Sequence, residues 1–193
     1  MRSESTRARK LPGSYQVALI AVLALTGAGF GLGAAGYRIN ATNSLPPGIW
    51  KVVALDSPPA HGDIVSVCPP AVKALEDAKS RGYLHTGTCS GWFEPLFKPV
   101  AAVPGDTVTV TPEGLRVNGA PIANSIALAV DGNGAELPHL AAGKYVVGAG
   151  EIWVVSAYNR WSFDSRYFGP VSLASVQGRA IPVLVQVVPP EWR

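Results

Sequence analysis

The chain has 193 residues, of which 48% are hydrophobic and only 15% are charged. An average soluble domain carries about 25% charged residues, and this chain has ample apolar surface to bury, so intrinsic disorder is excluded as its main state. The formal net charge of +3 arises within residues 1–10, where four basic side chains oppose Glu4, and this excludes a basic nucleic-acid-binding domain in the remainder.

A long uncharged segment follows the basic tail. No charged residue or histidine lies between Lys10 and Arg38, and most residues between them are Ala, Val, Leu, Ile or Gly. Because a helix of about 20 residues spans a hydrocarbon core of about 30 Å, we expect a transmembrane helix over residues 15–37. Basic residues stay on the cytoplasmic side, so residues 1–14 are predicted to be a cytoplasmic tail and residues 38–193 an extracytoplasmic domain.

The same segment is compatible with three alternatives to a simple membrane anchor. A cleaved signal peptide has a shorter apolar core of about 7–15 residues, although Ala34-Ala35-Gly36 resembles a small-residue cleavage site. A buried helix of a soluble domain would be weakened in water by the glycines at 27, 29, 31, 33 and 36. Their i, i+4 spacing would also allow a second membrane helix to approach closely.

The segment after the helix has the pattern of β structure. The whole chain contains 21 glycines and 17 prolines, which suit short strands joined by turns. One amphipathic helix is predicted over residues 71–81, and the weakly patterned residues 125–142 are predicted to form a mobile excursion. Strands are predicted over 49–55, 63–68, 96–103, 107–111, 115–117, 151–156 and 180–188. This pattern favours a mainly β domain with a barrel-like or mixed-sheet architecture.

The two cysteines of the chain are Cys68 and Cys89. The topology argument places both outside the membrane, where disulfides persist, so we expect a bridge that closes an insert around the predicted helix. Such a bridge would stabilise the folded state by about 3 kcal/mol in the chain-entropy model. Two free buried thiols are the alternative.

Most familiar catalytic signatures are missing from the sequence. The histidines at 61, 85 and 139 have no metal-ligand spacing, and two cysteines cannot build a typical structural zinc site. No phosphate loop, dinucleotide fingerprint or Gly-x-Ser-x-Gly elbow occurs. Three other clusters stand out, at residues 40–48, 98–106 and 162–170.

Two of these clusters contain groups suited to acyl transfer. Ser44 precedes Pro46, Pro47 and Gly48, which fix a turn, so its hydroxyl would be presented from a rigid loop; a simple polar connector is the alternative. Lys98 lies inside an apolar run, where burial would lower the pKa of its amine. A neutral lysine can take the proton of a serine hydroxyl, whereas an edge lysine facing water could not.

The three clusters, in this order after a membrane helix, resemble the type I signal peptidase family, which uses a Ser–Lys dyad. Ser44-Leu45-Pro46-Pro47 is similar to the Ser-Met-x-Pro nucleophile box of the family, with Leu45 in place of methionine. Lys98, followed by Pro104-Gly105-Asp106, is similar to the general-base box. Residues 162–170, Ser-Phe-Asp-Ser-Arg-Tyr-Phe-Gly-Pro, are similar to the third box.

A finer resemblance is to the TraF-like conjugative-transfer branch of this family. It rests on residues 44–50, on the insert from Cys68 to Cys89, and on the third box. The chain departs from the bacterial housekeeping enzymes in having one predicted membrane segment. Ala157-Tyr158-Asn159-Arg160 also stands where Gly-Asp-Asn-Arg is usual.

The resemblance implies a role for each matched residue. Ser44 would be the nucleophile, and Lys98 the general base that later protonates the leaving amine. The backbone N–H of Ser44 and the hydroxyl of Thr42 would donate to the oxyanion, and Ser162 would orient the lysine. Asp164 and Arg166 would form a structural ion pair, with an exposed surface pair as the alternative. Ser–Lys acyl transfer needs no metal and no cofactor, and none is implied.

The resemblance also implies an activity and a location. The expected protein is a single-pass enzyme of the inner membrane with its catalytic domain on the periplasmic side. It would remove leader segments from exported, membrane-embedded precursors, with a conjugative pilin as the expected substrate, cyclisation as one fate, and conjugation or secretion machinery as a partner. A general signal peptidase, a self-cleaving regulator of the same fold and a non-enzymatic assembly factor are the alternatives. No nucleic-acid partner is expected.

Overall fold

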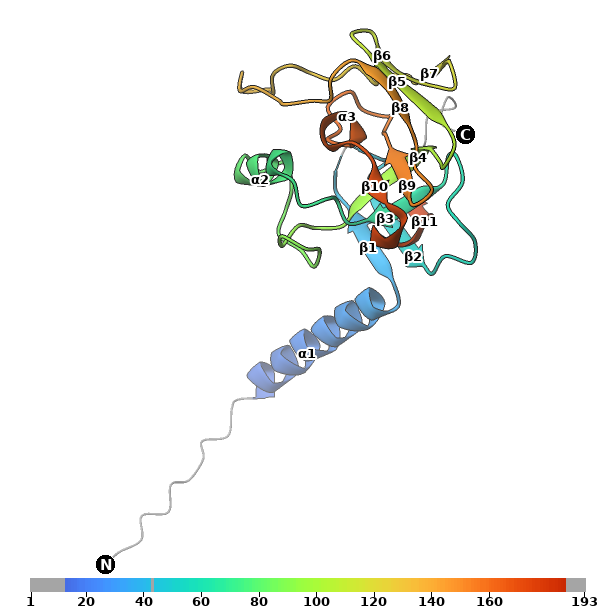
Figure 1. Ribbon diagram of the computed structural model, residues 1–193. Helices are drawn as coiled ribbons and strands as arrows, with labels where there is room; N and C mark the ends of the chain where they lie inside the picture. Colours follow the sequence, from blue (N-terminus) through green and yellow to red (C-terminus); the bar gives the residue numbers. More distant parts are fainter. Residues whose placement is uncertain (1–12, 43, 187–193) are drawn as a thin grey trace, which may run out of the picture. The chain divides into compact units, whose positions relative to one another are not determined.

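The computed structural model describes residues 13–42 and 44–186, and the chain divides into two units, residues 1–37 and 38–193 (Figure 1). The first unit contains helix α1, Gly13–Ala34, none of whose residues is buried. Among the described residues, α1 is the one helix long and apolar enough to cross a membrane. Most of the predicted basic tail lies outside the described residues.

Helix α1 ends three residues before the predicted end of the membrane segment at residue 37. Gly36 adopts a positive φ of 90°, a conformation that glycine reaches without steric cost. Its N–H bonds to the carbonyl of Gly33 at 3.1 Å, which closes the last turn, and Tyr37 then begins the first strand. The turn at Gly36 therefore separates helix from sheet.

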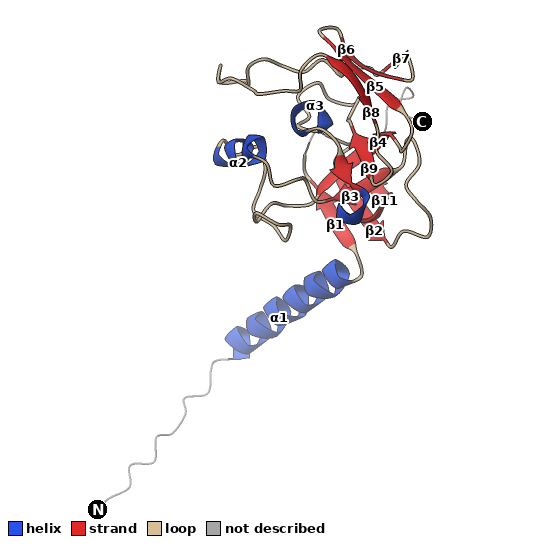
Figure 2. Cartoon of the chain, in the orientation of Figure 1, coloured by secondary structure: helices blue, strands red, loops and turns tan. Residues whose placement is uncertain are grey.

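The second unit is built mainly from strands, as Figure 2 shows. A seven-stranded sheet has the order β1-β2-β11-β3-β4-β9-β10, and a four-stranded sheet has the order β7-β6-β5-β8. The strands of the first sheet are β1 Tyr37–Asn40, β2 Gly48–Val53, β3 Ile64–Val67, β4 Leu96–Ala102, β9 Glu151–Val154, β10 Val171–Ser172 and β11 Val176–Val185. Those of the second are β5 Thr107–Thr111, β6 Gly114–Val117, β7 Ala120–Pro121 and β8 Gly143–Val146. This arrangement confirms a mainly β domain with one N-terminal apolar helix.

The helices of the second unit are short. They are α2 Lys73–Ser80, the single-turn α3 Ser165–Phe168, and the 3-10 helix η1 Leu173–Ser175. The insert helix was predicted within about two residues at its start and one at its end. Strands β1, β7, β8 and β10 and helix α3 were not predicted. Strand β11 begins at Val176, four residues before its predicted start, and the predicted end at residues 187–188 lies outside the described residues.

The interior strand β4 shows how the fold places a lysine inside the domain. Burial alternates along it, so Leu96, Lys98 and Val100 point to one side and are all buried. Strand β3 pairs antiparallel with β4 and sets Val65 opposite Lys98. Since side chains of a strand alternate between faces, Lys98 shares the face of two core residues.

The segment predicted as a mobile excursion has no helix or long strand between residues 122 and 142, but it is tied to the insert. The carboxylate of Asp131 accepts hydrogen bonds from the backbone N–H groups of Asn133 and Ala135, at 2.8 and 2.9 Å. It also accepts from the hydroxyl of Tyr83 and the guanidinium of Arg81. Figure 1 shows this segment on the same side of the domain as α2.

Candidate active site

Ser44 lies in the loop between β1 and β2, and Asn40 organises that loop. The side-chain amide of Asn40 donates to the carbonyls of Thr42, Leu45 and Pro46 at 3.2, 3.1 and 3.3 Å. Its carbonyl oxygen accepts from the backbone N–H of Thr42 at 3.1 Å. One buried amide therefore fixes the backbone on both sides of Ser44.

Apolar packing anchors the same loop from the other direction. Leu45 has no exposed surface, and it packs with Trp50 and Ala180 in a small core cluster. The indole N–H of Trp50 donates to the carbonyl of Pro46 at 3.1 Å. Leu45 thus anchors the loop that carries Ser44 in the core.

The amine of Lys98 contacts two serine hydroxyls. Its Nζ lies 2.6 Å from Ser44 Oγ and 2.7 Å from Ser162 Oγ, and the two hydroxyl oxygens are 3.3 Å apart. Lys98 is only 3% exposed. The structure thus brings the lysine together with two serines that are 54 and 64 residues from it in sequence.

Burial changes the chemistry of this amine. Loss of solvation, which penalises the charged form, lowers the pKa of Lys98 from 10.5 to about 8. The charge of Arg166 lowers it further, while Asp164 and Glu94 oppose the shift. At pH 7, about a tenth of the amine is therefore neutral and able to accept a proton, a far larger fraction than for an ordinary lysine.

Asp164 and Arg166 form a buried ion pair rather than a surface pair. Neither side chain has any exposed surface, and Arg166 Nε and Nη2 each lie 2.8 Å from one carboxylate oxygen of Asp164. Arg166 Nη2 also donates to the carbonyl of Ser162 at 2.6 Å. Through this contact the pair holds the backbone that carries Ser162. Removing one partner of such a buried pair costs about 3–5 kcal/mol.

Ser156 is a site residue that the sequence analysis did not identify. Its hydroxyl donates to the backbone carbonyl of Ser44 at 2.5 Å, and it is fully buried. Its backbone N–H donates to Asp164 Oδ2 at 3.0 Å. Ser156 therefore connects the ion pair to the backbone of Ser44. The only signal in the sequence was a serine at the end of a strong β run.

Thr42 has its hydroxyl proton engaged in this arrangement. Its Oγ1 donates to Asn40 Oδ1 at 2.8 Å. A hydroxyl has a single proton to donate, so a donor role toward an oxyanion requires the Thr42 side chain to leave Asn40. The backbone N–H of Ser44 belongs to the same loop.

A cleft of about 380 Å³ opens beside the Ser44 and Lys98 side chains. Residues 38–42 form one wall, and residues 94–98 of β4 and the segment before it form another. Ser66, residues 83–85 of the insert and Phe163 complete the lining. The side chains of Ser44 and Lys98 thus border this open space.

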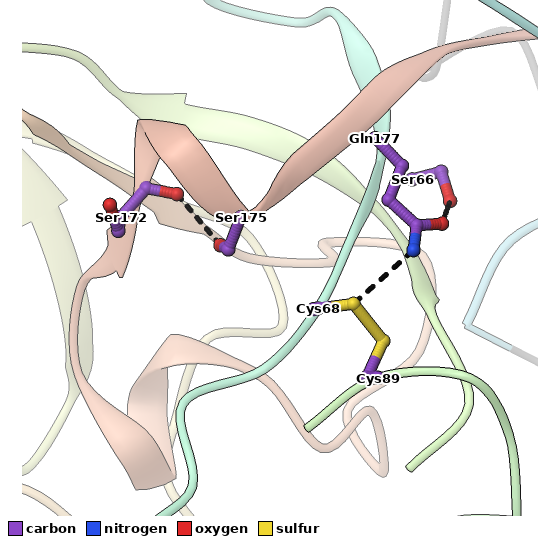
Figure 3. The surroundings of a disulfide bond; sticks show 6 residues. All are labelled: Ser66, Cys68, Cys89, Ser172, Ser175 and Gln177. Carbon is purple, nitrogen blue, oxygen red and sulfur yellow. Dashed lines mark hydrogen bonds between the residues drawn. A yellow bond between two sulfur atoms is a disulfide. The ribbon is translucent and has the colours of Figure 1, made fainter. Parts of the chain in front are cut away.

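The insert that contributes to this cleft is closed by a disulfide bond. Cys68 follows β3 and is bonded to Cys89, with a Cα–Cα distance of 5.5 Å (Figure 3). The side-chain amide of Gln177 contacts Cys68 Sγ at 3.3 Å, and Ser66 donates to Gln177. The predicted bridge is confirmed, and it joins the insert to the end of a core strand.

The described part of the chain offers no metal site. Across residues 13–42 and 44–186, no three His, Cys, Asp or Glu side chains gather in an arrangement that could hold an ion. His61 instead contacts Asp106 Oδ2 at 2.7 Å, and the backbone N–H of Val103 donates to the same oxygen at 2.7 Å. Asp106 of the second cluster therefore holds a turn rather than joining the Ser–Lys pair.

Several known proteins are similar to this chain over most of its length. The profile of the family described as "Signal peptidase, peptidase S26" matches residues 13–185. The "Probable conjugal transfer protein TraF" of Sinorhizobium fredii is 39% identical over 174 residues, which are 90% of this chain and 88% of that protein. The "Conjugal transfer protein TraF" of Agrobacterium fabrum is 42% identical over 148 residues, covering 77% of this chain and 82% of that protein.

A crystal structure of a signal peptidase I from Enterococcus faecalis aligns with 21% identity and a TM-score of 0.37, covering 64% of this chain and 97% of that one. The profile match extends over most of the chain, and so do the matches to both TraF proteins. The chain therefore belongs to the signal peptidase family, peptidase S26.

Proposed function

We propose that this chain is a membrane-anchored serine endopeptidase in which Ser44 is the nucleophile and Lys98 is the general base. The observation that carries the proposal is the distance of 2.6 Å between Lys98 Nζ and Ser44 Oγ. The lowered pKa of Lys98, about 8, supports the same role. A nucleophile within hydrogen-bond reach of a base, with a third group orienting the base, is the arrangement that acyl transfer requires.

The mechanism follows from these contacts. Neutral Lys98 accepts the proton of the Ser44 hydroxyl as its oxygen attacks the scissile carbonyl, while Ser162 holds the amine in place. The oxyanion accepts hydrogen bonds from the Ser44 backbone N–H and from the Thr42 hydroxyl once Thr42 has turned away from Asn40. Protonated Lys98 then donates to the leaving amine, and an acyl ester of Ser44 remains. A single oxyanion donor of this kind contributes about 2.7–4 kcal/mol.

The pH dependence of acylation tests this mechanism. Protonated Lys98 cannot act as a base, so the rate at which a penem acylates Ser44 is expected to rise about tenfold per pH unit at low pH. It should level off above a midpoint of about 8, the pKa of the buried amine. Intact-mass measurement of the adduct between about pH 6 and pH 10 gives the profile. A pH-independent rate, or a midpoint at the ordinary lysine pKa, would contradict the assignment.

Ser156 is proposed to position the nucleophile through the Ser44 carbonyl. Replacing it with alanine leaves that buried acceptor without its partner, which costs about 1–3 kcal/mol. We expect Ser156→Ala to lower kcat about tenfold with little change in KM, because the backbone of the nucleophile loosens. Ser156→Thr retains a hydroxyl and should restore most of kcat, while exposed Ser57→Ala serves as the control. Equal losses in Ser156→Ala and Ser156→Thr would exclude the positioning role.

The proposed substrate is a membrane-embedded precursor with a small-residue cleavage site. β1 is the terminal strand of the seven-stranded sheet, and residues 38–42 line the cleft. An extended segment can add beside such an edge through backbone hydrogen bonds.

We propose α1 as the anchor, residues 1–14 as its cytoplasmic tail and residues 38–193 as the periplasmic domain, in an inner membrane beside the conjugation machinery. Relatives named as conjugal transfer proteins favour a pilin-like precursor.

We further propose that the acyl ester is resolved in part by the substrate's own amine. A precursor held in the same membrane keeps its N-terminus near Ser44 at a high effective concentration. Attack by that amine gives a cyclic product, which is lighter than the linear mature peptide by one water. Intact-mass spectrometry of the processed partner is expected to show the cyclic species. A product found solely at the linear mass, with a free N-terminus, would exclude cyclisation and leave cleavage unaffected.

A further inference from the structure

A second cavity lies beside the candidate active site. Its volume is about 230 Å³, and Tyr83 and Phe163 line both this cavity and the cleft that contains Ser44 and Lys98. We call it the side cavity; its remaining lining residues are Leu128, Asp131, Gly132, Leu137, Trp161 and Tyr167. The two spaces are therefore neighbours that share two aromatic side chains.

Hydrogen bonds join the two segments that form the side cavity. Asp131 is 8% exposed, and its carboxylate accepts from the Tyr83 hydroxyl of the insert and from two backbone N–H groups of its own segment. The Tyr167 hydroxyl accepts from the backbone N–H of Leu128 at 3.1 Å, which ties the same segment to α3. The walls therefore have fixed positions next to the Ser–Lys pair.

The chemistry of the lining favours an apolar guest. Asp131 is the single charged residue of the lining, and its oxygens are engaged by the partners named above. Phe163 stacks on Tyr167 with ring centroids 5.0 Å apart, and Trp161 remains 58% exposed. Exposed aromatic side chains beside a pocket are typical of binding anchors. The lining of the side cavity has no unpaired charge that could attract a charged side chain.

We infer that the side cavity binds one apolar side chain, aromatic or branched aliphatic, of the polypeptide whose backbone occupies the cleft. This inference rests on the proposed peptidase function and adds a specificity site to it. Whole small-molecule ligands occupy pockets of about 300–1,000 Å³, so a cavity of about 230 Å³ suits a single side chain. Continuity through Tyr83 and Phe163 identifies the guest as part of the same chain that reaches Ser44.

Gly132 is a lining position at which a side chain can be added without straining the backbone. A Cβ added at Gly132 meets no atom within 4 Å, and its φ lies outside the positive region. Gly132→Leu therefore places a side chain at the cavity wall. Gly150 has the same freedom and lies outside the lining, so Gly150→Leu is the matched control.

The test uses the full-length protein in lipid nanodiscs and a panel of quenched fluorescent peptides. Every peptide has alanine at the cleavage site, and Phe, Leu, Ala, Asp or Lys is scanned through the flanking positions. We expect one position at which Phe or Leu raises kcat/KM about tenfold over Ala. Gly132→Leu should abolish that preference, mainly through KM, while Gly150→Leu retains it. Penem acylation of Ser44 should be unchanged in Gly150→Leu.

Binding of the same peptides to Ser44→Ala, followed by fluorescence anisotropy, separates the two hypotheses. One outcome is that no peptide is cleaved and no penem adduct forms, while binding still prefers an apolar residue and Gly132→Leu removes that preference. This outcome would support the side cavity as a binding site and contradict the peptidase proposal. If cleavage is normal, but no position prefers an apolar residue or Gly132→Leu behaves like Gly150→Leu, the side cavity is not a substrate site.

Discussion

Replacing Ser44 with alanine is expected to abolish peptide cleavage and penem labelling while the fold stays intact. The hydroxyl is the proposed attacking atom, and loss of a lone nucleophile costs several powers of ten in rate. The fold should tolerate the change because Lys98 keeps its hydrogen bond of 2.7 Å to Ser162. Cleavage assays, adduct mass and urea unfolding of the purified protein measure the three effects.

Ser44→Cys is the companion variant. It keeps a nucleophile at the same position but changes its size and acidity, so a trace of activity is expected. Near-normal cleavage by a well-folded Ser44→Ala protein would remove Ser44 from the mechanism. Absence of both cleavage and penem labelling in the unmodified protein would instead favour the non-enzymatic assembly factor.

The parts of the fold that could be predicted from sequence have strong local patterns. Residues 107–111 alternate between threonine and valine, and β5 has those bounds. The apolar run around Lys98 predicted both strand β4 and a buried amine. The uncharged segment before Arg38 gave α1, although its end depended on the left-handed turn at Gly36.

The elements that were missed have little local signal. Strand β1 has four residues, two of which are the polar Arg38 and Asn40. Helix α3 is a single turn that begins because the Asp164 side chain accepts from the backbone N–H of Arg166. Neither has the length over which hydrophobic periodicity can be read, so each forms through contacts with the rest of the domain.

The candidate site shows the same division. The resemblance to the signal peptidase boxes named Ser44, Lys98, Ser162, Asp164 and Arg166, but it did not find Ser156, whose partner is 112 residues away. It did not show that Asn40 organises the nucleophile loop either. Both residues act on backbone carbonyls, Ser156 on one that is distant in sequence and Asn40 on three that are near it. Such hydrogen bonds leave no pattern in a single sequence.

Replacing Lys98 with arginine is expected to lower cleavage by several powers of ten, although a positive charge is kept. A guanidinium stays protonated at any accessible pH, so it cannot take the Ser44 proton. Arginine must also fit where lysine is 3% exposed, and an extra buried charge beside Arg166 would destabilise the fold. Unfolding alone could thus inactivate Lys98→Arg.

Lys98→Met separates the loss of the base from unfolding. Methionine has a similar length and is neutral, and it belongs comfortably beside Leu96 and Val100 on the buried face of β4. We expect the urea midpoint of unfolding of Lys98→Met to be at least as high as that of the unmodified protein, because the substitution removes a buried amine. We also expect Lys98→Met to be inactive at every pH tested. Alanine variants of His61, His85 and His139 should cleave normally. Activity in Lys98→Met, or its loss in a histidine variant that folds normally, would assign the base to another residue.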